Sequence, residues 1–501
     1  MTEKKTNPVY SISIAITFAI VAWGLVSPGS FGKFATLLNG GLTKYYGWGY
    51  MLSMNIFVAF SIFVGLSRFG KVRLGPQDSR PEYSNMSWFA MLFSAGMGVG
   101  LVFYGAAEPL SHFGSLPLGA DPGSIQAARD AMRMSFLHWG LHPWAGYAVI
   151  ALPLAYYQFR YNSPGLISSV FIPLIGEEKV RGKLGKTVDI LAIFATLAGI
   201  TTSLGLGALQ LNSGLSSIYG IPKAITTQVI LILILAILYT GSAVLGIDKG
   251  IKRVADFNLN VCLFLMAALF VVGPTFPIID GFVTGIGDYL SGVISDSFTL
   301  APYGGPREGF LRGWTLYYWA WWIAWAPFVG SFIARISRGR TIREFVAGVL
   351  VVPAVGSFVW FAIFGVSALH LEIVKNINIS AEVLKDVSVG IFAMYAQYPF
   401  GTIMSAIMLV LITTFFVTSA NSGTFVLSML SSEGNLTPPK NKMGIWGILM
   451  AALAVVLLLT GGLQNLQTVS LAAAAPFSII MIFACISFWR ALCKDEAEGK
   501  L

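Results

Sequence analysis

The sequence has little charge and few cysteines and histidines for its length. Only 11% of its 501 residues are charged, whereas soluble proteins have about 25%. The three cysteines, Cys262, Cys485 and Cys493, form no CxxC motif or Cys/His pairing, so we expect neither a disulfide framework nor a zinc site. Four histidines and no paired carboxylates within apolar segments give no catalytic constellation. We therefore expect a protein that is not an enzyme and that needs no resident cofactor.

Apolar residues dominate what remains. They make up 55% of the chain, and the mean hydropathy is +0.73. Windows of about 20 mostly apolar residues recur along the chain, as membrane-spanning helices require. The expected spans are 9–28, 47–67, 86–107, 136–159, 187–210, 225–246, 254–275, 311–336, 344–369, 400–430, 443–463 and 466–489. The expected fold class is an all-α polytopic membrane protein with twelve transmembrane helices in the lipid bilayer.

The basic residues predict the orientation of these spans. If the connections alternate from a cytoplasmic N-terminus, 23 of the 32 Lys and Arg residues lie inside and 9 outside. This bias places both termini in the cytoplasm, with the protein in the cell inner (plasma) membrane. The first span follows the N-terminus without a small-residue cleavage site, so we expect it to stay attached. The net charge of +9 reflects this loop bias, and no nucleic acid partner is expected.

Two outer connections and one inner one have further patterns. The segments 277–297 and 379–399 interleave apolar and polar residues, which suits helices lying flat at the membrane interface or folded extracellular loops. Four arginines follow the eighth span on the expected cytoplasmic side: Arg335, Arg338, Arg340 and Arg343. They are read as positive-inside anchors, with a gating role through acidic partners as the alternative.

The third span contains three glycines at alternate positions, Gly96, Gly98 and Gly100. Each glycine costs a helix about 1 kcal/mol relative to alanine. Transporters use broken helices to bind substrates and ions through free backbone groups. Close helix packing at small residues is the alternative. We expect an unwound, functional segment here.

Full charges lie close to the expected ends of the spans. Glu108, Asp189, Asp256 and Arg335 are the examples. A proton relay of buried carboxylates is therefore not expected.

Aromatic residues gather in two spans. Five of the 13 Trp residues fall within 314–325, and Trp139, Trp144 and Tyr147 lie in the fourth span. Aromatic cages bind quaternary ammonium groups through cation–π attraction. We expect Trp322 to complete such a cage with the three rings of the fourth span, and packing or interfacial anchoring is the alternative.

The tenth span is rich in hydroxyl and amide side chains within an apolar helix. These residues are Thr413, Thr414, Thr418, Ser419, Asn421 and Ser422. Hydroxyls beside the carbonyls of a broken helix suit Na⁺, a hard cation that binds oxygen. Hydrogen bonds back to the helix are the alternative, favoured for Thr413.

Several motifs together resemble the betaine/choline/carnitine transporter family over nearly the whole chain. They are Gly96-Met97-Gly98-Val99-Gly100, Phe103-Tyr104-Gly105-Ala106-Ala107-Glu108-Pro109, His138-Trp139, His142-Pro143-Trp144, Tyr318-Trp319-Ala320-Trp321-Trp322 and Ala334-Arg335-Ile336-Ser337-Arg338-Gly339-Arg340.

The resemblance implies a LeuT-like inverted repeat of five plus five helices and a homotrimer. Residues 1–85 would hold two accessory spans, and residues 490–501 a short cytoplasmic tail. The two repeats would be 86–275 and 311–489, joined by an extracellular amphipathic connection over 276–310.

The same resemblance implies the site residues. Trp319, Trp321 and Trp325 join the cage as substrate-binding candidates, together with Gly96, Met97, Gly98 and Gly100. One Na⁺ would bind the carbonyls of Ser94, Met97 and Phe415 and the hydroxyls of Thr418 and Ser419. A possible second Na⁺ would use Thr196, Ser203 and Phe328, but Ile200 stands where a second threonine is expected.

The substrate follows from Gly100. Choline carriers of the family tend to have Asp at this position, so glycine favours a zwitterion that brings its own carboxylate. We expect secondary active uptake of glycine betaine, or of a close relative, by Na⁺ symport with alternating access. A proton-coupled choline carrier and a carnitine/γ-butyrobetaine-type exchanger are the alternatives, and an osmotically gated channel is less favoured. Osmoprotection and nutrient uptake are both open as roles.

Overall fold

The computed structural model of the protein describes residues 7–96, 98–115, 119–246 and 248–501. Within these ranges the secondary structure is helical, apart from one isolated bridge between Arg73 and Thr341. Asn7 caps the first helix, because its side chain accepts a hydrogen bond from the backbone N–H of Val9. The fold is therefore all-α, as the sequence predicts.

The helices of the first half are, in chain order, α1 (Pro8–Val26), α2 (Pro28–Tyr45), α3 (Gly47–Leu66), η1 (Arg68–Lys71), α4 (Asn85–Gly96), α5 (Val99–Gly114), α6 (Ile125–Trp139), α7 (Leu141–Tyr161), η2 (Ile167–Phe171), α8 (Ile172–Ile175), α9 (Glu177–Arg181), α10 (Lys183–Tyr219), α11 (Ile225–Leu245) and α12 (Asp248–Val272). Those of the second half are α13 (Thr275–Ser297), α14 (Pro306–Phe310), η3 (Leu311–Thr315), α15 (Leu316–Ile336), α16 (Ile342–Ile373), α17 (Ser380–Val383), η4 (Val387–Val389), α18 (Gly390–Tyr395), α19 (Gly401–Leu430) and α20 (Lys440–Ala497).

Eight helices in the described ranges are long and apolar enough to cross a membrane, and nine if the bent pair α4 and α5 forms one span. Their outer faces are apolar as well, since Leu233 and Ile237 on α11 and Phe264 on α12 are exposed. Apolar surface of this extent is typical of contact with lipid. The protein is a polytopic membrane protein.

Three helix breaks are found among the described residues. The axes of α4 and α5 meet at 70°, α6 and α7 meet at Gly140, and α20 has non-helical backbone at Gly461 and Gly462. A side chain at position 140 would lie 2.5 Å from the carbonyl oxygen of Phe136, so only glycine fits there. The first break confirms the interruption that the alternating glycines predict.

Two connections differ from the sequence prediction. Most of the connection expected between the first two spans, residues 29–46, is helical, because α2 covers Pro28–Tyr45 and begins with a proline in its first turn. Segment 277–297 forms a helix as expected, α13, whereas 379–399 folds into the short elements α17, η4 and α18 with many buried residues. The second segment is therefore a folded connection rather than one flat helix.

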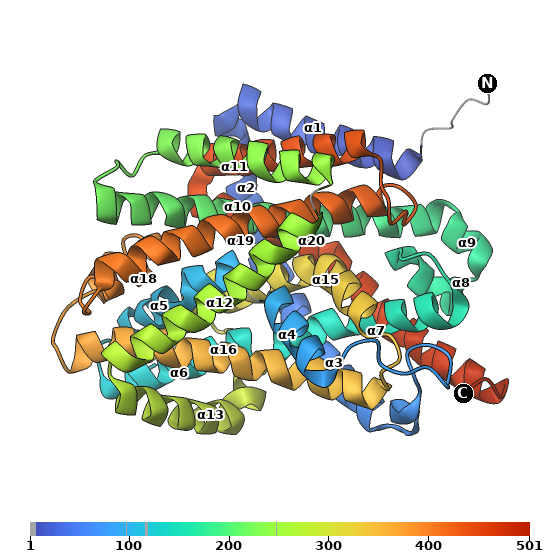
Figure 1. Cartoon of the computed structure of the whole chain (residues 1–501), viewed down its shortest axis with the longest axis horizontal. Helices are drawn as coiled ribbons and strands as arrows, with labels where there is room; N and C mark the ends of the chain where they lie inside the picture. Colours follow the sequence, from blue (N-terminus) through green and yellow to red (C-terminus); the bar gives the residue numbers. More distant parts are fainter. Residues whose placement is uncertain (1–6, 97, 116–118, 247) are drawn as a thin grey trace.

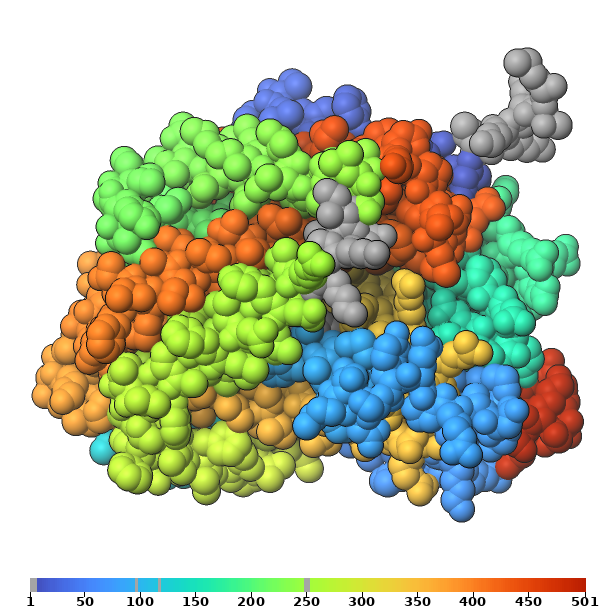
Figure 2. Space-filling model, in the orientation of Figure 1, coloured from blue at the N-terminus to red at the C-terminus, as the bar shows by residue number. Residues whose placement is uncertain are grey.

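The core is built by helices that are buried on all sides. Residues Val99–Phe113 of α5, His142–Tyr157 of α7 and Leu316–Ala324 of α15 are buried without interruption. Helix α15 crosses the middle of the molecule in Figure 1. In the space-filling view α12, α19 and α4 form a large part of the visible face (Figure 2).

The basic segment after α15 is bound to the protein rather than free. Arg340 donates hydrogen bonds to Asn85 Oδ1 and to the carbonyl of Tyr83, and its guanidinium lies 3.9 Å from the Trp88 ring centre. Arg343 donates to the carbonyl of Gly65. Both contacts hold the start of α16 against the rest of the protein, and the positive-inside interpretation of these positions stays a prediction.

Candidate functional site

Four aromatic rings from α6, α7 and α15 form a cluster that we call the cage: Trp139, Trp144, Tyr147 and Trp322. The centres of Trp139 and Trp322 lie 4.9 Å apart with planes at 75°, and Tyr147 lies 6.4 Å from Trp322. Trp144 and Tyr147 are 5.5 Å apart at 89°. All four rings are buried. At these distances and angles the rings pack edge to face. The contacts gather at one point the aromatic rings whose faces can attract a cation.

Local structure explains how these rings meet. Trp139 is the last residue of α6, and Gly140 interrupts the helix before α7 begins. Trp144 and Tyr147 are three residues apart and so lie on one face of α7. Close contact of Gly330 on α15 with Ile150 on α7 brings the two helices together. The sequence prediction that these rings converge is confirmed, while their role in substrate binding stays a prediction.

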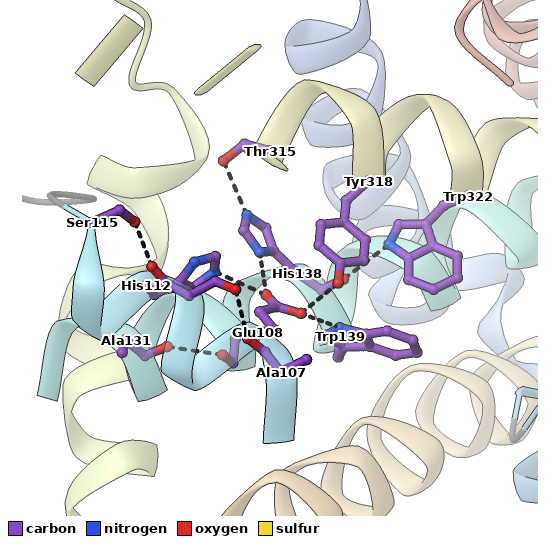
Figure 3. Close-up of polar contacts among 12 residues, drawn as sticks. Ala107, Glu108, His112, Ser115, Ala131, His138, Trp139, Thr315, Tyr318 and Trp322 are labelled. Carbon is purple, nitrogen blue, oxygen red and sulfur yellow. Dashed lines mark hydrogen bonds and ion pairs between the residues drawn. The ribbon is translucent and has the colours of Figure 1, made fainter. Parts of the chain in front are cut away.

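A buried carboxylate lies behind Trp139. Glu108 Oε2 accepts hydrogen bonds from Trp139 Nε1 (2.9 Å) and from the Tyr318 hydroxyl (2.5 Å). Its Oε1 lies 2.7 Å from His138 Nδ1 and 3.1 Å from His112 Nε2 (Figure 3). These five residues converge from α5, α6 and α15 and are all buried.

This cluster corrects the expectation that Glu108 lies near the end of a span. Helix α5 continues to Gly114, so Glu108 is in its interior and fully buried. One signal for this cluster is visible in the sequence, because Glu108 and His112 are four residues apart and share a helix face. The contributions of His138 and Tyr318 come from distant segments and have no such signal.

The other tryptophans of α15 lie around the cage rather than in it. Trp321 stacks on Trp322 at 4.8 Å and 18°. Trp319 donates to Met51 Sδ and stacks on His142, and Trp325 packs against Phe328 and the backbone at Gly199. Among these three candidates, Trp321 is the one that contacts a cage ring.

The glycine run forms the break between α4 and α5. Helix α4 ends at Gly96, Gly98 is extended, and α5 begins at Val99. Gly100 packs against Trp321, because a Cβ there would lie 2.4 Å from the indole. Met97, predicted to contribute to both the substrate and the ion site, lies outside the described residues.

The break faces the hydroxyl-rich part of α19. A Cβ on Gly98 would lie 4.0 Å from Ser419 Oγ. The Thr418 hydroxyl donates to the carbonyls of Thr414 and Phe415, which leaves its lone pairs free to bind a cation. Ser94 is half-buried near the end of α4. The candidate ligand atoms among the described residues are carbonyl and hydroxyl oxygens without net charge, which are compatible with Na⁺.

The second predicted ion site lies where α10 packs on α15. The Thr196 hydroxyl is buried and has no hydrogen-bond partner among the described residues. Ser203 donates to the carbonyl of Gly199, and Ile200 is buried between them. Phe328 packs against Trp325, which in turn lies against Gly199 of α10. Thr196 is thus the one hydroxyl of this set that lacks a protein partner.

The comparisons with known proteins cover nearly the whole chain and point to one transporter family. The model for "BCCT, betaine/carnitine/choline family transporter" matches residues 8–497. The glycine betaine transporter OpuD of Bacillus subtilis is 46% identical over 497 residues, 99% of this chain and 96% of that protein. The probable glycine betaine transporter of Desulfitobacterium hafniense is 42% identical, with 99% of each chain covered. The ectoine/hydroxyectoine transporter of Virgibacillus pantothenticus is 44% identical over 495 residues, 99% of this chain and 98% of that protein.

Proposed function

Because the chain belongs to the betaine/carnitine/choline family of transporters, we propose that it imports glycine betaine by Na⁺ symport with alternating access. The observation that carries this proposal is the cage of Trp139, Trp144, Tyr147 and Trp322. A trimethylammonium group has no N–H to donate, so ring faces are the partners available to it. The protein is a transporter and not an enzyme.

The proposed Na⁺ site would lie next to the break between α4 and α5. This proximity supports coupling between Na⁺ binding and substrate binding. The described members of this site are the carbonyls of Ser94 and Phe415 and the hydroxyls of Thr418 and Ser419, and Met97 would complete it. Ser419 faces Gly98, and Gly100 two residues later packs on the cage neighbour Trp321. An ion at α19 and a substrate at α15 would therefore both contact one short irregular segment, which is how their binding would be coupled.

A possible second Na⁺ would bind at Thr196 on α10, with Ser203 and Phe328. The unpartnered Thr196 hydroxyl supports it. The isoleucine at position 200 argues against it, because an alkyl chain has no lone pair to offer. We therefore propose one Na⁺ site and leave open how many ions move in each transport cycle.

The proposed topology has twelve spans in a LeuT-like arrangement. The eight apolar helices and the bent pair α4 and α5 account for nine. Helices α7 and α15, each of 21 residues but less apolar, and the division of α20 at Gly461 would supply the other three. Cytoplasmic termini, a plasma-membrane location and a homotrimer complete the proposal.

Transport into proteoliposomes tests this function. Labelled glycine betaine is supplied outside, under an inward Na⁺ gradient or an equal K⁺ gradient. Accumulation above the equilibrium level with Na⁺ alone is the expected result. Uptake that ignores Na⁺ but responds to internal carnitine would indicate the exchanger, and uptake of choline driven by protons would indicate the choline carrier.

The relative named for ectoine and hydroxyectoine supplies a second candidate substrate. Unlabelled ectoine is therefore included as a competitor in the same assay. We expect glycine betaine to compete more strongly, because the cage suits a quaternary ammonium group. Stronger competition by ectoine would reassign the substrate.

A further inference from the structure

The proposed function leaves Glu108 without a role, although the residue is fully buried in the helix that follows the break. An ionisable residue inside a membrane protein is costly unless it is paired, and it commonly marks a functional site. Glu108 accepts a hydrogen bond from Trp139 and pairs with His138, whose backbone carbonyl accepts from Trp322 (Figure 3).

The hydrogen-bond pattern suits an ionised carboxylate. Trp139 and Tyr318 both donate to Oε2, and an ionised carboxylate is the form that only accepts. His138 Nε2 lies 3.0 Å from the Thr315 hydroxyl, which can donate to it. The Nδ1 of His138 then carries its proton toward Glu108.

The same distances favour hydrogen bonding over a metal centre. Oε1 of Glu108 and Nδ1 of His138 are 2.7 Å apart. A tetrahedral zinc ion with bonds of about 2.0 Å would hold two ligand atoms about 3.3 Å apart. We therefore treat Glu108, His112 and His138 as a hydrogen-bonded cluster.

Two of the three indoles of the cage, Trp139 and Trp322, are hydrogen-bonded to this cluster. Trp139 donates directly to Glu108, and Trp322 Nε1 donates to the backbone carbonyl of His138 at 2.9 Å. His138 is itself held by Glu108. One carboxylate on α5 therefore fixes the ring at the end of α6 and, through His138, the ring on α15.

The carboxylate also acts on the electrons of the Trp139 ring. An indole that donates its N–H to an anion is polarised, and negative charge moves toward the ring. Cation–π attraction depends on negative charge at the ring face. A carboxylate behind the ring therefore strengthens the attraction of its face for a cation without contacting that cation.

We propose that Glu108 is a positioning residue of the cage, which orients Trp139 and Trp322 and increases the affinity of the Trp139 face for a quaternary ammonium group. This inference rests on the proposed function, in which the cage binds that group.

Two variants separate orientation from charge. Glu108→Gln keeps the volume and one oxygen that can accept from Trp139 and Tyr318. Its amide can donate to His138 Nδ1 once the proton of His138 moves to Nε2, where the Thr315 hydroxyl can accept it. The variant then removes the charge while it keeps the hydrogen bonds to Trp139 and Tyr318. Glu108→Ala removes both. The matched control is Asp296→Asn, because Asp296 holds the same helix α6 through two hydrogen bonds from Arg133, at 2.6 and 2.8 Å.

The first measurement is equilibrium binding of labelled glycine betaine at saturating Na⁺. We expect Kd to rise about 10-fold in Glu108→Gln, at least about 100-fold in Glu108→Ala and less than about 3-fold in Asp296→Asn. Competition by 3,3-dimethylbutanoate, which has a carbon atom in place of the charged nitrogen, should change little in Glu108→Gln. Thermal unfolding confirms that each variant is folded.

A second measurement needs no substrate. Ultraviolet resonance Raman spectra report the hydrogen bond of an indole N–H, and the difference between the wild type and Trp139→Phe isolates Trp139. We expect this band to shift in Glu108→Ala. An unchanged band would overturn the structural link.

The outcomes separate the two proposals. A wild-type protein that binds no glycine betaine would refute the proposed function, and the Raman band would still test the link between Glu108 and Trp139. A wild type that binds, with Glu108→Gln and Glu108→Ala both unaffected or equal to Asp296→Asn, would overturn the inference. Equal weakening of both ligands in Glu108→Gln would overturn the role of charge.

Discussion

Gly100 lies directly against Trp321, so that a Cβ atom at position 100 would be 2.4 Å from Cη2 of the indole. The indole stacks in turn on Trp322, with ring centres 4.8 Å apart. The absence of a side chain at the start of α5 therefore sets the position of a cage ring.

Gly100→Ala should displace Trp321 and, through the stack, Trp322. We expect uptake of glycine betaine to fall at least about 10-fold, because overpacking a buried site costs about 1–3 kcal/mol. The measurement is initial uptake normalised to the amount of folded protein. Gly241→Ala is the control, because its Cβ would meet no atom within 4 Å. Equal uptake in both variants would contradict the packing argument.

Trp322→Leu should remove one wall of the cage while keeping the site apolar. Loss of a desolvated cation–π contact of about 2 kcal/mol predicts binding at least about 30-fold weaker. The measurement is the Kd of glycine betaine in the detergent-solubilised protein. Trp48→Leu, at an exposed indole, should leave Kd unchanged. An unaltered Kd in Trp322→Leu would refute the cage.

Ser419→Ala should raise the Na⁺ concentration needed for half-maximal uptake. Ser419 lies beside Gly98, and its hydroxyl is a proposed ligand. We expect an increase of about 10-fold, the effect of losing about 1.4 kcal/mol of ion binding. Ser428→Ala serves as the control, because that hydroxyl donates to the carbonyl of Thr424 in the same helix. If the two variants respond alike to Na⁺, Ser419 is not a ligand.

Arg340→Lys should destabilise the protein without affecting ion or substrate affinity. Lysine lacks the planar fork that donates to Asn85 and Tyr83 and stacks over Trp88. We expect a loss of about 2 kcal/mol, typical of hydrogen bonds to a charged group, seen as a lower Tm. Arg338→Lys, at an exposed position, should retain the wild-type Tm. A gating role would instead alter transport at normal stability.

Asp386 gives a prediction for pH. It lies in the connection between α17 and η4, outside the spanning helices. Burial raises the pKa of its carboxyl, but hydrogen bonds from Ser388 and Lys223 outweigh burial and hold the pKa below its usual value. The pKa of this carboxyl is lower in the folded protein than in the unfolded chain, where it is about 3.9. The carboxyl therefore stabilises the fold above about pH 3.9, and this stabilisation is lost as the pH falls through the pKa of the folded protein.

Asp386→Asn should therefore lower Tm at pH 7 and lose this effect at acidic pH. The pair with Lys223 is partly exposed, so the difference should stay below about 1 kcal/mol. Thermal unfolding between pH 3 and 7 measures it. Glu382→Gln, at an exposed carboxyl, should show no such dependence. A difference in Tm that is the same at every pH would rule out this cause.

The sequence predicted those features that depend on local pattern. Apolar length gave the helices α11 and α19 to within a residue or two, and the alternating glycines gave the break before Val99. Helical spacing gave the shared face of Trp144 and Tyr147. Such features depend on nearby residues, which the sequence states directly.

The sequence could not predict convergence between distant segments. Glu108, His138 and Tyr318 meet only because α5, α6 and α15 pack together. Helix α2 was missed because its glycines and polar residues lower its hydropathy, although Pro28 is a typical start. Trp319 and Trp325 lie on the same helix as Trp322 but contact Met51, His142 and Phe328, and the sequence does not indicate which neighbours each indole meets.

The helix break at Gly140, between α6 and α7, has a mechanical consequence for the cage. Trp139 moves with α6, Trp144 and Tyr147 move with α7, and Trp322 moves with α15. A cation that contacts all these rings would connect three separate helices at one point. When the cation leaves, the helices would be free to move independently. The empty and loaded proteins should therefore differ in stiffness at this joint.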